Sequence, residues 1–509
     1  NAPPSGDQTA YQPSLKLTLV SGPNASGSWT SGDGAFTACS GGAASSDEQY
    51  TINASNLSGN LTATPPAGFE ISLTSGSGYV SSPSTLTIPQ ANAEAGDIIY
   101  VRMASGSSNP TTANLSINGG GLSSAVTTSL SGSYTSAPAQ PGTISGDNPL
   151  CSSTNTAYTI SSVSGATSYN WSYSASGSIS GSSTTGTLNA TAAGTISVTA
   201  TNSCGTSSAR TLAVTLKPTT LYVSTSGTDD ASHGHASGSD AYATVAYAVS
   251  QACSGASVTI NVGAGTYTET GITIPDGTTN LTIDGAGMGS TIFDGTQSDR
   301  FLLINNSGDN DQVGNCSGIT ISDMTIKEHR KTSDGGAAIK IEENISSISI
   351  TNVKFESNQT TGNNSGHGGA VLIEEGSTVT LTGCTFLSND AGYSSGSDFT
   401  KGGGLYADGG SSNAATVTLN QCIFSNNTAN DYGGGAGHQY TTFNMNNCLF
   451  YENTCDEYGG GFSAYYGTTT ANNCTFSDNT STDYGGGVYG SSGTHTFNNS
   501  IIFGNTGYG

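Results

Sequence analysis

The chain has 509 residues, of which 9% are charged, and its 35 Asp and Glu against 11 Lys and Arg give a formal net charge of −24. This acidic balance argues against nucleic acid and anionic membrane surfaces as partners. No apolar run approaches the roughly 20 residues of a membrane-spanning helix, so we expect no membrane insertion by this chain.

The composition is typical of a β-rich extracellular protein with many turns. Glycine alone contributes 71 residues, and Ser, Thr and Asn fill much of the remainder. No signal peptide is visible at Asn1, so for a secreted protein we expect the signal to have been removed already. The expected location is therefore extracellular, at the cell surface.

Residues 1–13 are polar and proline-rich and predict an extended lead. From 14 to 136, short alternating apolar runs are separated by Gly, Ser and Pro, which predicts a β-sandwich. The segment 137–142 is a linker by composition. The strands expected in this sandwich are 15–20, 50–52, 61–63, 69–73, 84–88, 98–103, 113–117 and 126–130.

Residues 143–217 predict a second sandwich, with strands at 157–160, 168–173, 194–200 and 211–216. Trp171 is the expected core aromatic, with Tyr169 and Tyr173 on the same strand parity. Cys151 and Cys204 would close a loop of 54 residues, counted from 151 to 204. In an oxidising compartment we expect this disulfide, worth about 4 kcal/mol through loop-closure entropy.

Both sandwiches resemble modules of Bacteroidota surface proteins. The first resembles an immunoglobulin-like module in Tyr50-Thr-Ile-Asn-Ala-Ser-Asn-Leu-Ser-Gly-Asn-Leu61, Pro66-Ala-Gly-Phe-Glu-Ile-Ser72 and Ile99-Tyr-Val-Arg102. The second resembles a polycystic-kidney-disease-like (PKD-like) module in Tyr169-Asn-Trp171 and Val198-Thr-Ala-Thr-Asn-Ser-Cys-Gly205. The resemblance implies that these modules act as spacers in a protein exported by type IX secretion.

The last expected domain, 218–509, begins at Pro218. Its first part, in Leu221-Tyr-Val-Ser-Thr-Ser-Gly227 and Val258-Thr-Ile-Asn-Val-Gly-Ala-Gly-Thr-Tyr267, resembles the entry of pectate-lyase-like β-helices. Between these runs, Val245, Val249 and Ala252 have near-helical spacing, which predicts a short helix that caps the open end of a solenoid.

A repeat with a fixed step of 26 residues dominates the C-terminal part of the chain. Phe-x-x-Asn begins at Phe424, Phe450 and Phe476 (450 − 424 and 476 − 450), and Ile502 continues the series. A fixed period of this size predicts a solenoid. Apolar residues alternate with Thr, Asn and Ser inside each copy, which indicates strands and leaves no helical stripe.

Stacking such copies predicts a right-handed parallel β-helix, because one coil is too thin to bury its own apolar face. The fold class is therefore all-β, with two N-terminal immunoglobulin-like β-sandwich domains followed by this β-helix. The asparagine that ends each Phe-x-x-Asn is expected to stack on the next one and to bond the backbone. One inward column should hold Val353, Cys384, Cys422, Cys448, Cys474 and Ser500. Another should hold Ile350, Leu381, Leu419, Met445, Ala471 and Phe497, and a third Ile348, Val379, Val417, Phe443, Thr469 and His495.

The four cysteines of the first column have two open interpretations. They are either buried thiols that behave as small apolar residues, or pairs on adjacent coils within disulfide range.

The repeat is also similar to that of chlamydial polymorphic outer membrane proteins. Phe-x-x-Asn alternates with a Gly-Gly-aliphatic motif, as in Gly369-Ala-Val371 and Gly404-Leu405. This resemblance, which covers about 335–509, implies a surface-exposed adhesin. The autotransporter barrel of that group is not in the sequence, nor is a C-terminal sorting domain, so we expect either a fragment of a longer protein or a different export route.

A column of tyrosines is the first candidate binding site. Tyr432, Tyr458 and Tyr484 each precede a Gly-Gly-Gly triplet and are flanked by Asp431, Glu457 and Asp483. Aromatic faces beside the carboxylates of Asp431 and Asp483 would suit sugar rings. Alternatively, the rings only stack on one another and brace the glycine turns.

Two other clusters are candidates for chemistry. A polysaccharide lyase needs a base and cations that neutralise a uronate, and Lys327 and Arg330 of the basic cluster 327–331 would supply them. Asp309 and Asp311, or Asp229 and Asp230, have the oxygen ligands that calcium prefers. The alternatives are a solvated loop and ordinary turns, and no other cofactor is indicated.

Three functions follow from these features. The first is a secreted cell-surface adhesin that binds glycans or host or substrate surfaces, with outer-membrane secretion or anchoring proteins as further partners. The second is a polysaccharide lyase or hydrolase on the β-helix. The third is a structural subunit of an extracellular fibre.

Overall fold

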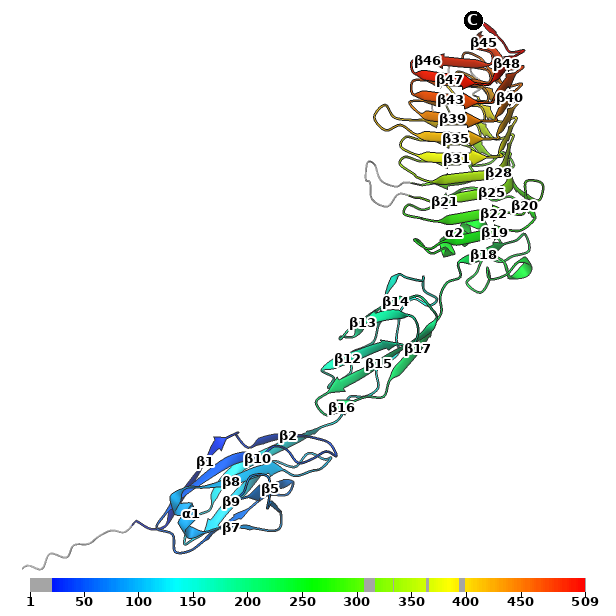
Figure 1. Cartoon of the computed structure of the whole chain (residues 1–509). Helices are drawn as coiled ribbons and strands as arrows, with labels where there is room; N and C mark the ends of the chain where they lie inside the picture. The colour runs from blue at the N-terminus through cyan, green and yellow to red at the C-terminus, as the bar shows by residue number, and fades with distance from the viewer. Residues whose placement is uncertain (1–20, 306–315, 333, 363–365, 393–398, 509) are drawn as a thin grey trace, which may run out of the picture. The chain divides into compact units, whose positions relative to one another are not determined.

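The computed structural model describes residues 21–305, 316–332, 334–362, 366–392 and 399–508. These residues form two compact units, one within 1–148 and 154–214 and the other within 149–153 and 215–509. Strands make up nearly all of the regular structure (Figure 1). Within the described ranges, no helix has the length and apolar character needed to cross a membrane.

The first sandwich consists of two five-stranded sheets that enclose one apolar core. Ile52, Phe69, Ile99 and Leu115 are fully buried between the sheets. A short helix, α1 (Gln90–Ala95), precedes β8. One sheet has the order β1 (Asn24–Ser31), β3 (Glu48–Ser55), β8 (Asp97–Met103), β5 (Phe69–Ser72), β6 (Val80–Ser81). The other has the order β2 (Ala35–Cys39), β10 (Val126–Thr135), β9 (Ala113–Gly119), β4 (Leu61–Thr64), β7 (Leu86–Ile88).

Every expected strand from 50 to 130 overlaps an observed one, but β1, β2, β6 and α1 were not expected. Strand β1 has a single large apolar residue, Trp29, so it lacks the alternation of apolar and polar residues that predicts a strand. It forms because Trp29 packs on Tyr50 of β3 with ring centroids 5.1 Å apart. Gly27 is needed there, since a Cβ atom would lie 2.2 Å from the Tyr50 hydroxyl oxygen. The expected extended lead and the strand 15–20 lie outside the described residues.

The second sandwich packs around Trp171 and Tyr158. Trp171 is buried as expected, and its indole N–H donates to the carbonyl oxygen of Ser183 at 2.9 Å. Gln140 and Pro141, in the segment expected as a linker, bond to Ala209 and Arg210 of this sandwich. One sheet contains β11 (Asn155–Thr159), β14 (Thr185–Ala190) and β13 (Gly177–Ser180). The other contains β12 (Ser168–Tyr173), β15 (Gly194–Asn202), β16 (Gly205–Thr206) and β17 (Arg210–Val214).

The expected Cys151–Cys204 disulfide is wrong, because both cysteines have other partners. Cys204 bonds Cys39, with the Cα atoms 5.2 Å apart, and Cys151 bonds Cys253, with the Cα atoms 5.5 Å apart. The reason lies in Leu150, which forms a parallel bridge with Leu216 at the start of the β-helix unit. This pairing removes Cys151 from the second sandwich and places it beside Cys253.

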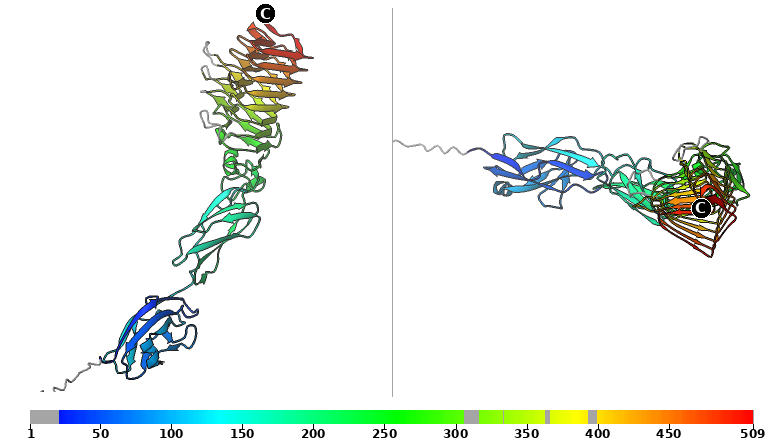
Figure 2. Two further views of the ribbon diagram at one scale, coloured as in Figure 1. Left: turned by 60° about the vertical axis from the view of Figure 1, so that its left-hand side comes forward. Right: turned by 90° about the horizontal axis from the view of Figure 1, so that it is seen from above.

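Three parallel sheets form the β-helix, and each strand pairs with the equivalent strand of the next coil (Figures 1 and 2). The eight-stranded sheet contains β21 (Ile272–Ile274), β24 (Leu302–Ile304), β27 (Ile339–Ile341), β30 (Val371–Ile373), β34 (Leu405–Asp408), β38 (Ala436–Gln439), β42 (Phe462–Tyr465) and β46 (Val488–Ser491). The seven-stranded sheet contains β26 (Arg330–Lys331), β29 (Gln359–Thr360), β33 (Asp390–Ala391), β37 (Thr428–Ala429), β41 (Thr454–Cys455), β45 (Thr480–Tyr484) and β49 (Thr506–Tyr508).

The largest sheet has 17 strands and covers the remaining side of the coils. It starts with β18 (Thr220–Val223), β19 (Val258–Val262), β20 (Gly265–Tyr267), β22 (Leu281–Gly285), β23 (Thr291–Asp294), β25 (Thr320–Lys327), β28 (Ile348–Glu356) and β31 (Thr378–Thr382). It continues with β32 (Thr385–Leu387), β35 (Thr416–Asn420), β36 (Ile423–Ser425), β39 (Thr442–Asn446), β40 (Leu449–Tyr451), β43 (Thr468–Asn472), β44 (Thr475–Ser477), β47 (Thr494–Asn498) and β48 (Ile501–Phe503).

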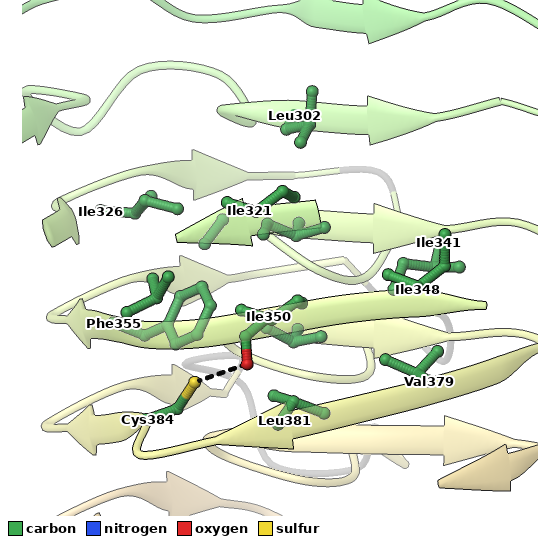
Figure 3. Packing of buried hydrophobic residues seen from close by; sticks show 14 of the residues in the cluster. Leu302, Ile321, Ile326, Ile341, Ile348, Ile350, Phe355, Val379, Leu381 and Cys384 are labelled. Carbon is green, nitrogen blue, oxygen red and sulfur yellow. Dashed lines mark hydrogen bonds between the residues drawn. The ribbon is translucent and has the colours of Figure 1, made fainter. Parts of the chain in front are cut away.

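Two of the three predicted columns, those of Ile348 and Ile350, are confirmed residue by residue. Ile350 pairs with Leu381, and the column continues in register to Phe497. Figure 3 shows part of this interior, where Cys384 donates its thiol hydrogen to the carbonyl oxygen of Ile350 at 3.4 Å. Four cysteines of the first column are buried, free thiols: Cys384, Cys422, Cys448 and Cys474. These cysteines are therefore buried thiols and do not form disulfides between adjacent coils.

The asparagine column is also confirmed and bonds adjacent coils to each other. The Asn427 side-chain amide donates to Asn453 Oδ1 of the following coil at 2.9 Å and to the Phe386 carbonyl oxygen of the preceding coil at 3.0 Å. Asn453 repeats this pattern with Asn479 and Phe424. These side chains are fully buried, so they satisfy backbone groups that the turns leave open.

The expected capping helix is α2 (Val245–Gln251), which covers the first coils. Its buried residues are Val245, Ala248 and Val249. The Thr244 side chain accepts from Tyr247 N–H, and the Glu269 carboxylate accepts from the N–H groups of Val245 and Ala246. A 3₁₀ turn at Gly238–Asp240 precedes this helix.

Candidate functional site

The tyrosine column predicted from the repeat is present, and its rings stack on one another. Tyr432, Tyr458 and Tyr484 are connected by parallel backbone bridges. Their ring centroids are 4.9 Å apart for the first pair and 5.8 Å for the second, with nearly parallel planes. The rings therefore cover one another's faces, as in the bracing alternative, and Tyr484 is the most exposed of them at 52%.

Lys401 occupies the position before Tyr432 in the same column, because Lys401 and Tyr432 form a parallel bridge. Its ammonium nitrogen lies 5.4 Å from the ring centroid of Tyr406 and 5.5 Å from that of Tyr432. A cation at this distance from an aromatic face is electrostatically attracted to it. One positive charge is thus fixed at the head of the tyrosine column.

A second outward column runs along the neighbouring eight-stranded sheet. Tyr406, Gly437, Ser463 and Tyr489 pair in register on strands β34, β38, β42 and β46. The residues that precede the first three belong to the apolar core, so this column points away from it. Tyr406 and Ser463 are nevertheless buried, so neighbouring side chains cover this column.

Tyrosines from the first column lie close to other tyrosines of the eight-stranded sheet. The ring centroid of Tyr432 is 5.9 Å from that of Tyr465 and 6.5 Å from that of Tyr489. Tyr458 and Tyr489 are closer still, at 4.7 Å. We call Tyr406, Tyr432, Tyr458, Tyr465 and Tyr489 the tyrosine face.

The tyrosine face contains a cavity of about 210 Å³. Its lining combines aromatic rings with an ammonium and an amide group, and consists of Phe399, Lys401, Tyr406, Asp431, Tyr432, His438, Gln439 and Tyr465. Such a mixture of ring surface and polar groups is characteristic of small-molecule sites.

Asp431 is the unusual member of this lining. It is 3% exposed, and both of its carboxyl oxygens are buried next to the carboxyl group of Glu457. Burial, together with the nearby carboxyl group of Glu457 on the next coil, raises the pKa of Asp431 to about 8. Asp483, at the equivalent position two coils further on, is exposed, so the carboxyl groups beside the tyrosine column differ in burial.

An acidic hollow of about 290 Å³ lies on the other side of Gln439. Burial raises the pKa of Glu374 and of Asp408, which both line it. The Lys340 ammonium compensates Glu374 at 3.0 Å. Across the described ranges, no group of three or more His, Cys, Asp or Glu side chains could hold a metal ion.

The two candidate lyase residues lie on different strands. Lys327 ends β25 and forms an ion pair with Asp294 at 2.8 Å, and this hydrogen bond raises the pKa of Lys327. An ammonium held in this way is a poor general base. Arg330 is exposed on β26. The sequence reading missed Arg300, which is buried and donates to the carbonyl oxygens of Gly335 and Gly336.

The candidate calcium ligands Asp309 and Asp311 lie outside the described residues. Asp229 accepts from the backbone N–H groups of Ala243 and Thr244, before helix α2. Asp230 bonds Ser232 and His233 within one turn. Both of these aspartates therefore have local structural partners.

Sequence reasoning found Tyr432 and Asp431 but missed Lys401, Tyr406, Gln439 and Tyr465. Lys401 was detectable, because it precedes Gly402-Gly-Gly404 as each tyrosine of the column precedes its own triplet. The other three carry no local signal. They come together only because the eight-stranded sheet and the tyrosine column are adjacent in each coil.

Comparisons with known proteins bear mainly on the second sandwich, where a family model described as a PKD-like domain matches residues 137–214. No curated protein matches the chain. Pectin methylesterase PemA from Erwinia chrysanthemi is 12% identical, with a TM-score of 0.27 over 53% of this chain and 80% of that one. The chicken CNTN1 FN1–FN3 domains are 17% identical, with a TM-score of 0.17 over 36% and 67%.

A third solved structure is invasin, a bacterial integrin-binding protein, which is 12% identical with a TM-score of 0.17 over 38% of this chain and 39% of that one. Likenesses this remote say nothing about activity. The fold of this chain rests on the strand pairings described above.

Proposed function

We propose that this chain belongs to a secreted, cell-surface adhesin whose β-helix binds glycans, with the two sandwich domains as spacers. The observation that carries the proposal is the cavity in the tyrosine face, where rings and hydrogen-bonding groups meet. The PKD-like match and the two disulfides support an extracellular setting, because disulfides persist in oxidising compartments.

Glycans suit this surface better than other ligands for a physical reason. Tyrosine presents an apolar ring and a hydroxyl group at once, and a sugar likewise has apolar C–H faces and polar hydroxyls. The stacked column offers mainly ring edges and hydroxyl groups. Tyr465, which is half-buried at the cavity, adds a ring outside that stack. Many such weak contacts along a surface reinforce one another through avidity.

A panel of immobilised polysaccharides tests the proposal, with retention of the protein and the size of each glycan both measured. We expect retention of the protein with the glycans left intact. Tyr465→Ala should weaken binding about tenfold, which corresponds to about 1.4 kcal/mol. Tyr451→Ala is the matched control, because Tyr451 is a partly exposed tyrosine on β40, in the 17-stranded sheet.

Shortened glycans would instead favour a lyase or hydrolase. Retention that Tyr465→Ala leaves unchanged would show that glycans bind at another part of the protein. The described geometry gives little support to a lyase at Lys327 and Arg330, because the Lys327 ammonium is already held by Asp294.

A further inference from the structure

The outer side of the 17-stranded sheet carries a regular array of threonine and asparagine side chains. Strands β31, β35, β39, β43 and β47 pair in register, and their outward residues form three columns that we call the threonine face. The first column is Thr378, Thr416, Thr442, Thr468 and Thr494. The second is Thr380, Thr418, Asn444, Thr470 and Thr496. The third is Thr382, Asn420, Asn446, Asn472 and Asn498.

The threonine face is uncharged, although the chain has a formal net charge of −24. Its side chains are all Thr or Asn, and each is half-buried or exposed. A charged group loses favourable hydration when it is pressed against another surface, and this loss is costly. Threonine instead presents a methyl group and a hydroxyl group that both donates and accepts. The face therefore matches an uncharged ligand that forms many hydrogen bonds.

The side chains of the threonine face are held in fixed positions. Threonine is β-branched and has little freedom at χ1. In the third column, the Asn446 amide donates to Asn420 Oδ1 at 3.0 Å, and Asn472 and Asn498 repeat this bond on the following coils. Figure 1 shows the five strands stacked as parallel rungs along one side of the coils. A rigid, repetitive ligand would therefore find the face already ordered, at a small cost in side-chain entropy.

The spacing of the columns indicates which repetitive ligand fits. Equivalent residues on adjacent coils are about 4.8 Å apart. Water molecules in ice hydrogen-bond tetrahedrally at about 2.8 Å, so the two oxygens on either side of one molecule are about 4.6 Å apart. We propose that the threonine face binds ice, with each column along one row of water molecules. This function is separate from glycan binding, because the tyrosine face is built on other parts of the coil.

Slow growth of ice on a cooled probe in a solution of the full chain tests the proposal. The protein is measured in the ice and in the remaining liquid, and we expect enrichment in the ice, since growing ice pushes out solutes that do not bind. A Thr418→Tyr, Thr470→Tyr double variant should lose this enrichment. Two large rings would stand out from the second column and hold the rest of the face away from the crystal.

Thr475→Tyr is the control for a new ring outside the threonine face. Thr475 lies on β44 of the same sheet and pairs with Leu449 and Ile501. This variant should enter the ice like the wild type. Tyrosine suits strands, and thermal unfolding checks that each variant keeps its fold. Thr496→Lys adds a charge at an exposed position of the second column and should also reduce enrichment, so the test does not depend on the double variant alone.

Exclusion of the wild type from ice overturns the proposal. Enrichment that neither the double variant nor Thr496→Lys alters also overturns it, as does an equal loss in Thr475→Tyr.

Tyr465→Ala separates this proposal from glycan binding, because it should weaken polysaccharide retention and leave ice enrichment unchanged. If polysaccharides retain the protein but ice excludes it, ice binding is wrong and glycan binding stands. If ice takes up the protein but polysaccharides do not retain it, the reverse holds.

Discussion

Asp431 is a carboxyl group whose environment penalises its charged form. Its pKa is raised from 3.8 to about 8, first by burial and then by Glu457. Between these values the unfolded chain has lost this proton, whereas the native chain keeps it. The native state therefore binds more protons, and the free energy of unfolding falls as the pH rises from about 4 to 8.

Asp431→Asn should remove this dependence. One proton contributes at most about 1.4 kcal/mol per pH unit, so the variant should gain stability relative to the wild type as the pH rises from 5 to 8. Chemical denaturation of both proteins over this range gives the comparison. Asp483→Asn changes an exposed carboxyl group of the same column and should leave the profile unaltered. Parallel profiles for the wild type and Asp431→Asn would contradict the assignment.

At the scale of elements, two asparagine columns differ in burial and permit a matched test. Asn453 is fully buried and bonds Asn427, Asn479 and the Phe424 carbonyl oxygen. Asn446 belongs to a half-exposed column and donates to Asn420 Oδ1 at 3.0 Å. Water can replace the partners of the second column but not those of the first.

Asn453→Ala should therefore destabilise the β-helix by about 2–4 kcal/mol, because it leaves several buried groups without partners, each at about 1–3 kcal/mol. Asn446→Ala should cost less than about 1 kcal/mol. Denaturant unfolding followed by circular dichroism measures both. Equal costs would show that burial does not govern these columns.

The β-helix registers could be predicted from the sequence because a parallel stack pairs equivalent residues, so the 26-residue step fixed each partner of Phe424, Phe450 and Phe476. The cavity could not be predicted, because its lining residues come from two faces of the coil that only the folded chain brings together. Strand β1 was not predicted, because its sequence does not alternate apolar and polar residues. The cysteine partners could not be predicted because spacing alone does not choose among pairings.

At the scale of the whole molecule, the disulfides cross-link distant parts of the sequence within each unit. Cys39 and Cys204 are 165 residues apart, and Cys151 and Cys253 are 102 apart. The first bond spans strands β3 to β10 and most of the second sandwich. The second encloses the whole second sandwich together with β18 and α2.

Pulling on the two ends of single molecules should reveal this cross-linking. Full extension at about 3.6 Å per residue makes the 165-residue segment about 590 Å long. The oxidised protein should therefore end about that much shorter than the reduced one. A Cys39→Ser, Cys204→Ser double variant should recover about 230 Å of this length without a reductant, because the remaining Cys151–Cys253 bond still bypasses 102 residues, or about 370 Å. Equal final lengths in all samples would exclude the Cys39–Cys204 bond.

The Cys39–Cys204 bond also determines which parts of the chain would feel tension in flowing liquid. Force that enters before Cys39 passes through sulfur to Cys204, so strands β3 to β10 lie outside its path and cannot be extended between the two ends. If the sandwich domains are spacers, as proposed, such a bypass keeps the tether short. Reduction of that one bond would convert it into a long, extensible one.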